Sequence, residues 1–253
     1  MNKPLLILAI LAAVVLSIRT AAAENPDAES LVKAAFEHYR GQASKAEVQM
    51  TIHRPSWERT LTMSAWTRGE ADSLIRIESP PKDKGNGTLK IGSDMWLYNP
   101  KINRVIKLPP SMMSQSWMGS DFSNNDLAKS DSILHDYRHT IDSTTARDGM
   151  RLFWIKSMPK PDAPVIWGMQ KLAIREDDII VAQQFYDEDM VLVKSMQCND
   201  IKMMGDRLFP VKWRMHKSEA QGHYTELVYK QLRFIDGLPD RIFTLSNLKN
   251  PRR

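Results

Sequence analysis

Apolar side chains recur along this chain in three different ways. Residues 4–16 are continuously apolar and uncharged, residues 31–39 are apolar at helical spacing, and from residue 48 onward apolar and polar positions alternate. Such patterns are typical of an export signal or membrane segment, of a helix, and of half-buried strands, respectively. The pattern therefore predicts a short leader and then a mostly β domain that opens with one helix.

The leader has the layout of a secretory signal peptide. Lys3 supplies the positive start, the apolar run follows, and Ala21-Ala22-Ala23 offers small residues at a cleavage site. An uncleaved anchor is the weaker alternative, because a spanning helix needs about 20 apolar residues. Since no cysteine stands at the cleavage point, we expect a protein without a lipid anchor. We expect cleavage after Ala23 and a mature domain of residues 24–253.

The helix is predicted to have Asn25 as its cap, Pro26 at its first position and Gly41 as its stop. About ten strands with short turns are expected after it, which implies an antiparallel meander. Residues 111–133 interrupt the alternation and are predicted to form a loop with one or two short helices, and a short helix is expected over residues 240–248. The expected architecture is one strongly curved sheet, with helical pieces that leave an apolar cavity on its concave face.

Composition and motifs then argue against a nucleic-acid-binding protein and against the common classes of enzyme. The net charge of +5 falls to +3 when Lys3 and Arg19 leave with the leader, and no basic stripe indicates a nucleic-acid partner. Cys198 is the only cysteine, so an internal disulfide is excluded. His-Glu-x-x-His, Gly-x-Ser-x-Gly and phosphate-loop motifs are absent, and the six histidines are scattered. We therefore expect a binding protein with no catalytic residue, cofactor or metal, rather than an enzyme.

The irregular segment is rich in methionine, which suits surfaces that accept variable apolar shapes. Its large apolar side chains either plug a gap in the core or form an adaptable lid over an apolar ligand, and we favour the lid. These side chains are Met112, Met113, Trp117, Met118 and Phe122.

Three ordered motifs carry a family resemblance. Trp96-Leu97-Tyr98-Asn99-Pro100 is followed by Arg104-Val105-Ile106-Lys107-Leu108; Gly119-Ser120-Asp121-Phe122 leads into Asp126-Leu127; and the chain closes on Leu238-Pro239-Asp240-Arg241-Ile242-Phe243-Thr244. Together they resemble the outer-membrane lipoprotein-sorting proteins, the LolA-like family, over nearly the whole mature chain.

The resemblance implies an unclosed β-barrel, or half-barrel, with a helical lid over the concave face and a cavity for acyl chains. It also implies a periplasmic carrier that takes a lipid or lipoprotein from an inner-membrane transporter to an outer-membrane acceptor. The expected lipid-binding residues are Met63, Trp96, Tyr98, Met112, Met113, Trp117, Met118 and Phe122. Arg68 stands where carriers of this family latch the lid, although Gly69 follows it where those carriers have proline.

Three other functions stay open at this level. The first is an envelope sensor that binds lipid and acts on a membrane regulator. The second is an accessory protein of an inner-membrane export transporter. The third is an enzyme acting on lipids, which would need a nucleophile and a base close in space.

Overall fold

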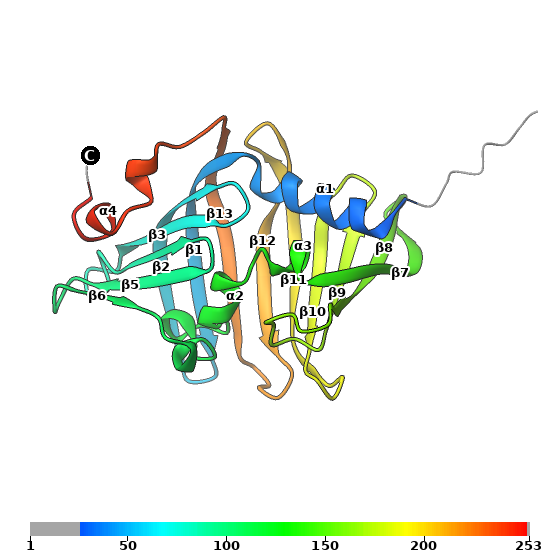
Figure 1. Ribbon diagram of the computed structural model, residues 1–253, viewed down its shortest axis with the longest axis horizontal. Helices are drawn as coiled ribbons and strands as arrows, with labels where there is room; N and C mark the ends of the chain where they lie inside the picture. The colour runs from blue at the N-terminus through cyan, green and yellow to red at the C-terminus, as the bar shows by residue number, and fades with distance from the viewer. Residues whose placement is uncertain (1–25, 252–253) are drawn as a thin grey trace, which may run out of the picture.

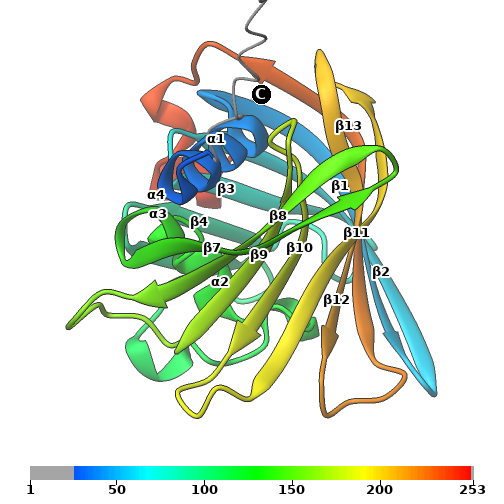
Figure 2. The same ribbon diagram turned by 90° about the vertical axis from the view of Figure 1, so that its right-hand side faces the viewer.

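The sheet is single, antiparallel and unclosed. The computed structural model describes residues 26–251, and within them thirteen strands pair in the order β6-β5-β4-β3-β2-β1-β13-β12-β11-β10-β9-β8-β7. Figures 1 and 2 show this sheet curving around α1 and the short helices α2 and α3. The half-barrel predicted from the sequence is confirmed. The expected leader and Asn25 lie outside the described residues.

The strands range from four to thirteen residues, and turns separate most of them. The number predicted, about ten, was too low, since the sheet has thirteen strands. The strands are β1 Ala43–Arg54, β2 Trp57–Arg68, β3 Asp72–Ser79, β4 Gly87–Ile91, β5 Asp94–Asn99, β6 Arg104–Lys107, β7 Tyr137–Arg147, β8 Met150–Pro159, β9 Met169–Arg175, β10 Ile180–Tyr186, β11 Leu192–Met204, β12 Arg207–Lys217 and β13 Tyr224–Ile235.

The first helix, α1 (Ala28–Arg40), begins two residues later than the sequence suggested. Its cap is Asp27, whose carboxylate accepts a 3.0 Å hydrogen bond from the Ser30 amide. The prediction that Pro26 begins the helix is therefore wrong, because the Asp27 carboxylate satisfies an amide of the first turn. The stop is confirmed: Gly41 has φ +61° and its N–H donates to Glu37 O.

The remaining helical pieces lie in two segments. The irregular stretch between β6 and β7 is confirmed as a loop with short helices: η1 Pro110–Met112, η2 Trp117–Gly119, α2 Asn124–Ala128 and α3 Ser132–His135. The C-terminal segment carries η3 Asp240–Ile242 and α4 Leu245–Lys249. Because β6 and β7 are the two edges of the sheet, the chain between them has to cross the open side of the half-barrel. We call this crossing segment, residues 110–135, the lid.

Alternation along the strands produces two packed faces. Ile75 and Ile77 of β3 join the main core cluster on the concave side, whereas Leu74, which precedes them on the strand, packs with Phe243 and Leu248. The lid and α1 therefore cover one face of the sheet, and α4 covers part of the other.

Candidate functional site

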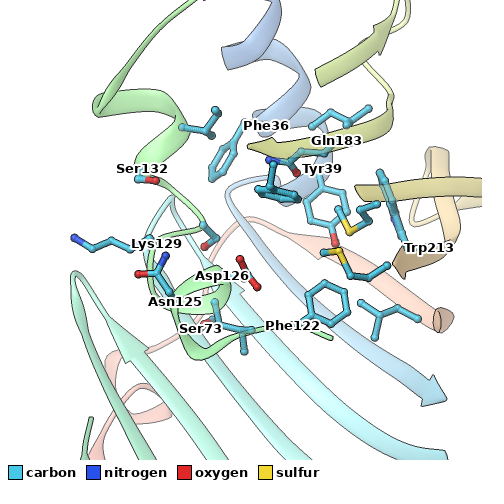
Figure 3. Close-up of a pocket in the computed structure, with 18 of the residues that line it drawn as sticks. Phe36, Tyr39, Ser73, Phe122, Asn125, Asp126, Lys129, Ser132, Gln183 and Trp213 are labelled. Carbon is cyan, nitrogen blue, oxygen red and sulfur yellow. The ribbon is translucent and has the colours of Figure 1, made fainter. Parts of the chain in front are cut away.

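A cavity of about 340 Å³ lies on the concave face, enclosed by α1, the lid and strands from both halves of the sheet. Figure 3 shows side chains from these elements converging on it. Its wall is mainly apolar, with contributions that include Phe36, Val48, Met63, Ala65, Leu172 and Leu227. The size lies within the roughly 300–1,000 Å³ range of small-molecule sites. An apolar chain is the kind of ligand that such a wall binds.

The lid is tied to the sheet by ion pairs spread along its length. The lid carries a carboxylate at every fifth residue over this stretch. Each binds a basic side chain, and the three basic side chains come from strands that lie far apart in the sheet. The pairs are Asp121 with Arg54 (3.0 Å), Asp126 with Lys194, and Asp131 with Lys90 (2.8 Å). Arg54 bonds both oxygens of Asp121, and bidentate contacts of this kind are geometrically specific. These contacts fix the closed position of the lid over the cavity.

The Lys194 ammonium group is almost fully removed from water. Its side chain is 4% exposed and that of Asp126 is 8% exposed. Burial lowers the pKa of Lys194, while the Asp126 carboxylate favours the charged form. The Nζ atom also lies 4.8 Å from the ring centroid of Trp167 and 5.1 Å from that of Phe185. The pair therefore places a buried charge contact at the boundary between lid and cavity.

The predicted lipid-binding residues separate into three places. Met63, Trp117 and Phe122 line the cavity. The other side chains lie outside its wall. Met112, Met113 and Met118 pack against the main core cluster, and Trp96 and Tyr98 pack on the opposite face of the sheet with Phe243 and Leu248.

Arg68 holds the C-terminal segment. Its guanidinium binds the Asp72 carboxylate at 2.8 Å, donates to Leu238 O, pairs with Asp240, and lies 4.6 Å from the Phe243 ring centroid. The hydrogen bonds of Arg68 thus tie the end of β2 to the segment that precedes α4. The lid ties come instead from Arg54, Lys90 and Lys194.

Several cavity residues escaped the sequence analysis because they come from late strands and from the inner face of α1. Trp213 and Met215 of β12 face inward, as does Tyr229 of β13. Alternation in β12, where Phe209, Val211, Trp213 and Met215 are all buried, was a signal that could have identified Trp213.

The cavity wall also contains hydrogen-bonded polar pairs. The hydroxyls of Tyr39 and Tyr229 bond each other, and Gln183 donates to Gln170 at 2.7 Å. Burial raises the pKa of both tyrosines, so each stays protonated at neutral pH. These polar groups lie within a wall that is otherwise apolar.

One nucleophile and base do meet in the structure. Ser157 Oγ lies 2.8 Å from His139 Nδ1, and Glu29 Oε2 lies 3.6 Å from His139 Nε2. The order acid, imidazole, hydroxyl is that of a hydrolase triad. Ser157, however, is 0% exposed, and His139 Nε2 also bonds the main-chain oxygen of Ile133. A substrate carbonyl cannot reach this hydroxyl, so the group joins α1 and α3 to the sheet rather than forming a reaction centre.

The described part of the chain has neither a metal-binding cluster nor a membrane-spanning helix. Residues 26–251 contain no cluster of three or more histidine, cysteine, aspartate or glutamate side chains placed to hold a metal ion. Over the same residues, no helix has the length and apolar character needed to span a bilayer.

Comparison with known proteins places the fold. A family model whose description reads "Uncharacterized protein" matches residues 69–250. The chain is similar to a DUF1329 family protein from Desulfovibrio piger, with 24% identity, a TM-score of 0.78, and coverage of 87% of this chain and 97% of that one. No curated protein matches it significantly.

Two further solved structures share the fold. One is a domain assigned to outer membrane lipoprotein sorting from Vibrio parahaemolyticus, with 21% identity, a TM-score of 0.75, and coverage of 88% of this chain and 98% of that one. The other is a LolA superfamily protein from Nitrosomonas europaea, with 20% identity, a TM-score of 0.72, and coverage of 87% and 98%. All three likenesses span nearly the whole of each compared chain.

Proposed function

We propose a carrier function for this chain, which belongs to the family whose model matches residues 69–250 and has the LolA-like fold. It binds the acyl chains of a lipid or lipoprotein in the cavity under the lid and carries them through the periplasm between the inner and outer membranes. The observation that supports this proposal is the apolar cavity of about 340 Å³ between the concave face of the sheet and a lid tied down by ion pairs.

The mechanism is burial rather than bond-making. A 16-carbon chain buried at about 0.8 kcal/mol per methylene gains roughly 13 kcal/mol before costs. Ordering the chain and moving the lid reduce that gain considerably. A chain held this way leaves only for a better acceptor, so loading and release require partners. An inner-membrane transporter as loader and an outer-membrane acceptor meet that requirement.

The cavity can be tested by filling it. Ala65 lines the cavity on β2, so Ala65→Trp places an indole where part of an acyl chain would lie. Losing contact with two methylenes removes about 1.6 kcal/mol, which weakens binding roughly tenfold. Ala146→Trp, on the exposed end of β7, makes the same substitution away from the cavity.

The measurement is titration of delipidated protein with a fluorescent fatty acid, and a thermal melt of each variant confirms folding. We expect wild-type protein and Ala146→Trp to bind alike and Ala65→Trp to bind much more weakly. Equal affinities in all three folded proteins would remove the cavity from the carrier proposal.

A further inference from the structure

Trp213 carries a buried hydrogen-bond donor in the wall of the cavity. The residue is 3% exposed and lines the cavity from β12. Within residues 26–251, its Nε1 atom has no hydrogen-bond partner. Trp117, another cavity tryptophan, instead donates from Nε1 to Thr88 Oγ1 at 3.0 Å. Buried donors in native proteins are nearly always satisfied, so the Trp213 N–H calls for an acceptor from outside the chain.

A second donor belongs to a tyrosine pair that contacts the Trp213 ring. The ring of Tyr39 stands edge-on to Trp213 with 6.4 Å between centroids, and its hydroxyl bonds that of Tyr229. Each hydroxyl carries one hydrogen, and their mutual bond uses one of the two. Stacking of Phe209 on Tyr39 at 5.3 Å, and its edge contact with Tyr229 at 4.9 Å, fix both rings. One O–H of this pair therefore remains to donate to another group.

Two cations near the cavity already have partners, and a third, Lys129, lies on the lid. Lys194 is paired with Asp126, and Arg40 donates to the main-chain oxygens of Gly69 and Asp72. Asp126 lines the cavity, and its Oδ1, a buried oxygen without a partner among the described residues, belongs to the lid. Figure 3 shows Tyr39 and Trp213 on one side of the cavity, with Asn125 and Lys129 on the other. The spare donors on the sheet side are thus uncharged.

We propose that Trp213, Tyr39 and Tyr229 form a subsite for an uncharged carbonyl oxygen, the ester or amide oxygen that joins an acyl chain to the rest of the ligand. The inference rests on the carrier function proposed above and specifies its ligand. Two neutral donors match the two lone pairs of a carbonyl oxygen. The same two donors have nothing to bind in a plain hydrocarbon. The subsite would set how far the chain enters the cavity, because the linkage is held at one fixed place.

The test distinguishes the effect of losing the hydrogen-bond donor from the effect of losing the aromatic ring. Trp213→Phe keeps an aromatic side chain and removes the N–H, and Tyr229→Phe removes one hydroxyl. Trp96→Phe is the matched control, since Trp96 packs on the opposite face of the sheet. Methyl palmitate and hexadecane are competed against bound diphenylhexatriene, a fluorescent probe without oxygen. Thermal melts accompany each titration.

We expect Trp213→Phe to weaken methyl palmitate binding about threefold to tenfold, the range for one neutral hydrogen bond, and to leave hexadecane binding unchanged. Tyr229→Phe still leaves the Tyr39 O–H free to donate, so it should weaken methyl palmitate binding less than Trp213→Phe does, and Trp96→Phe should change neither probe. An equal loss for both probes, or no loss for methyl palmitate, would overturn the subsite and leave the carrier function standing. If neither probe binds the wild-type protein, both proposals fail.

Discussion

Lys90 and Lys194 are lysines whose side chains are almost completely buried, and each meets a carboxylate of the lid. Burial lowers the pKa of both lysines, and the paired aspartate opposes that effect. A buried pair of this kind adds little net stability compared with apolar residues, but removing one partner leaves an uncompensated charge. At the residue scale, these lysines therefore specify where the lid lies.

His139 makes stability depend on pH. Burial lowers its pKa below the ordinary value near 6.5, although the Glu29 carboxylate opposes the shift. The unfolded chain takes up a proton as the pH falls through about 6.5, while the folded imidazole stays neutral. The contribution to stability is therefore complete above that pH and declines as the pH falls toward the lowered folded pKa.

We expect the melting temperature of the wild-type protein to fall between pH 7.5 and pH 5.5. His139→Asn, which does not titrate, should be less stable at pH 7.5 and lose less on acidification. Differential scanning calorimetry at the two pH values measures both effects. Equal pH slopes in the two proteins would show that other groups control the dependence.

Met113 and Met118 define a second test at this scale. Both pack against the main core cluster and lie outside the cavity wall, whereas Met63 lines it. Replacing both with glutamine puts amides among apolar side chains, and because both are partly buried, each contributes less than the roughly 1.5–3 kcal/mol of a fully buried methionine. We expect the melting temperature of the double variant to fall by several degrees.

The same double variant should lose less affinity for a fluorescent fatty acid than Met63→Gln does. Met203→Gln, at a side chain that is 66% exposed, serves as the neutral control. A double variant that melts normally but binds lipid more weakly than Met63→Gln would assign these methionines to the ligand, as the sequence pattern favoured.

The lid is the element on which the function depends. It connects the two edge strands β6 and β7, so its path across the concave face follows from the strand order. Its helices are short, and α2 has only five residues. Helices this short are not stable alone. Tertiary contacts, above all the ion pairs to the sheet, therefore hold the lid in place.

The strength of these contacts can be measured at Asp126. Asp126→Asn leaves the Lys194 ammonium buried without a counter-charge, and we expect a loss of about 3–5 kcal/mol in the free energy of unfolding. Asp94→Asn is the control, because its pair with Lys107 is exposed and such pairs contribute about 0–1 kcal/mol. Urea denaturation of both variants gives the comparison.

The double variant Lys194→Met with Asp126→Leu should regain much of that loss, since no buried charge remains. If Asp126→Asn costs no more than Asp94→Asn, the buried pair does not hold the lid.

At the scale of the whole molecule, the strands that come first and last in the sequence, β1 and β13, are neighbours in the middle of the sheet. β1 pairs with β13 over nearly its full length, so two wings, β2 to β6 and β7 to β12, extend from this pair. The wings curve toward each other without joining, and the lid spans the opening (Figure 2). An enclosed cavity results from a sheet that does not close.

Export remains a prediction for the whole chain. We expect the mature protein to begin at Glu24 and to appear in the periplasmic fraction, because the apolar run of the leader is too short for a spanning helix. N-terminal sequencing of protein from that fraction tests cleavage after Ala23. Recovery of residues 1–23 on protein from the membrane pellet would contradict it.

Local pattern determined much of the secondary structure. Alternation located the strands, Gly41 marked the helix stop, and the break after Pro110 marked the lid. Each of these signals is encoded within a few neighbouring residues, by side-chain periodicity or by a required backbone conformation. The half-barrel and lid followed from three ordered motifs that resemble a family.

Tertiary structure alone determined which face of a strand packs in the concave core and which packs against the C-terminal segment. Met95 and Leu97 of β5 face the concave core, while Trp96 and Tyr98 face α4, and all four are apolar or aromatic. Alternation separates two sets of side chains but does not say which set faces inward when both are apolar. The lid ties and the Tyr39, Tyr229 and Trp213 cluster join residues that are remote in sequence. Their contacts depend on the curvature of the sheet and the path of the lid, which no local pattern encodes.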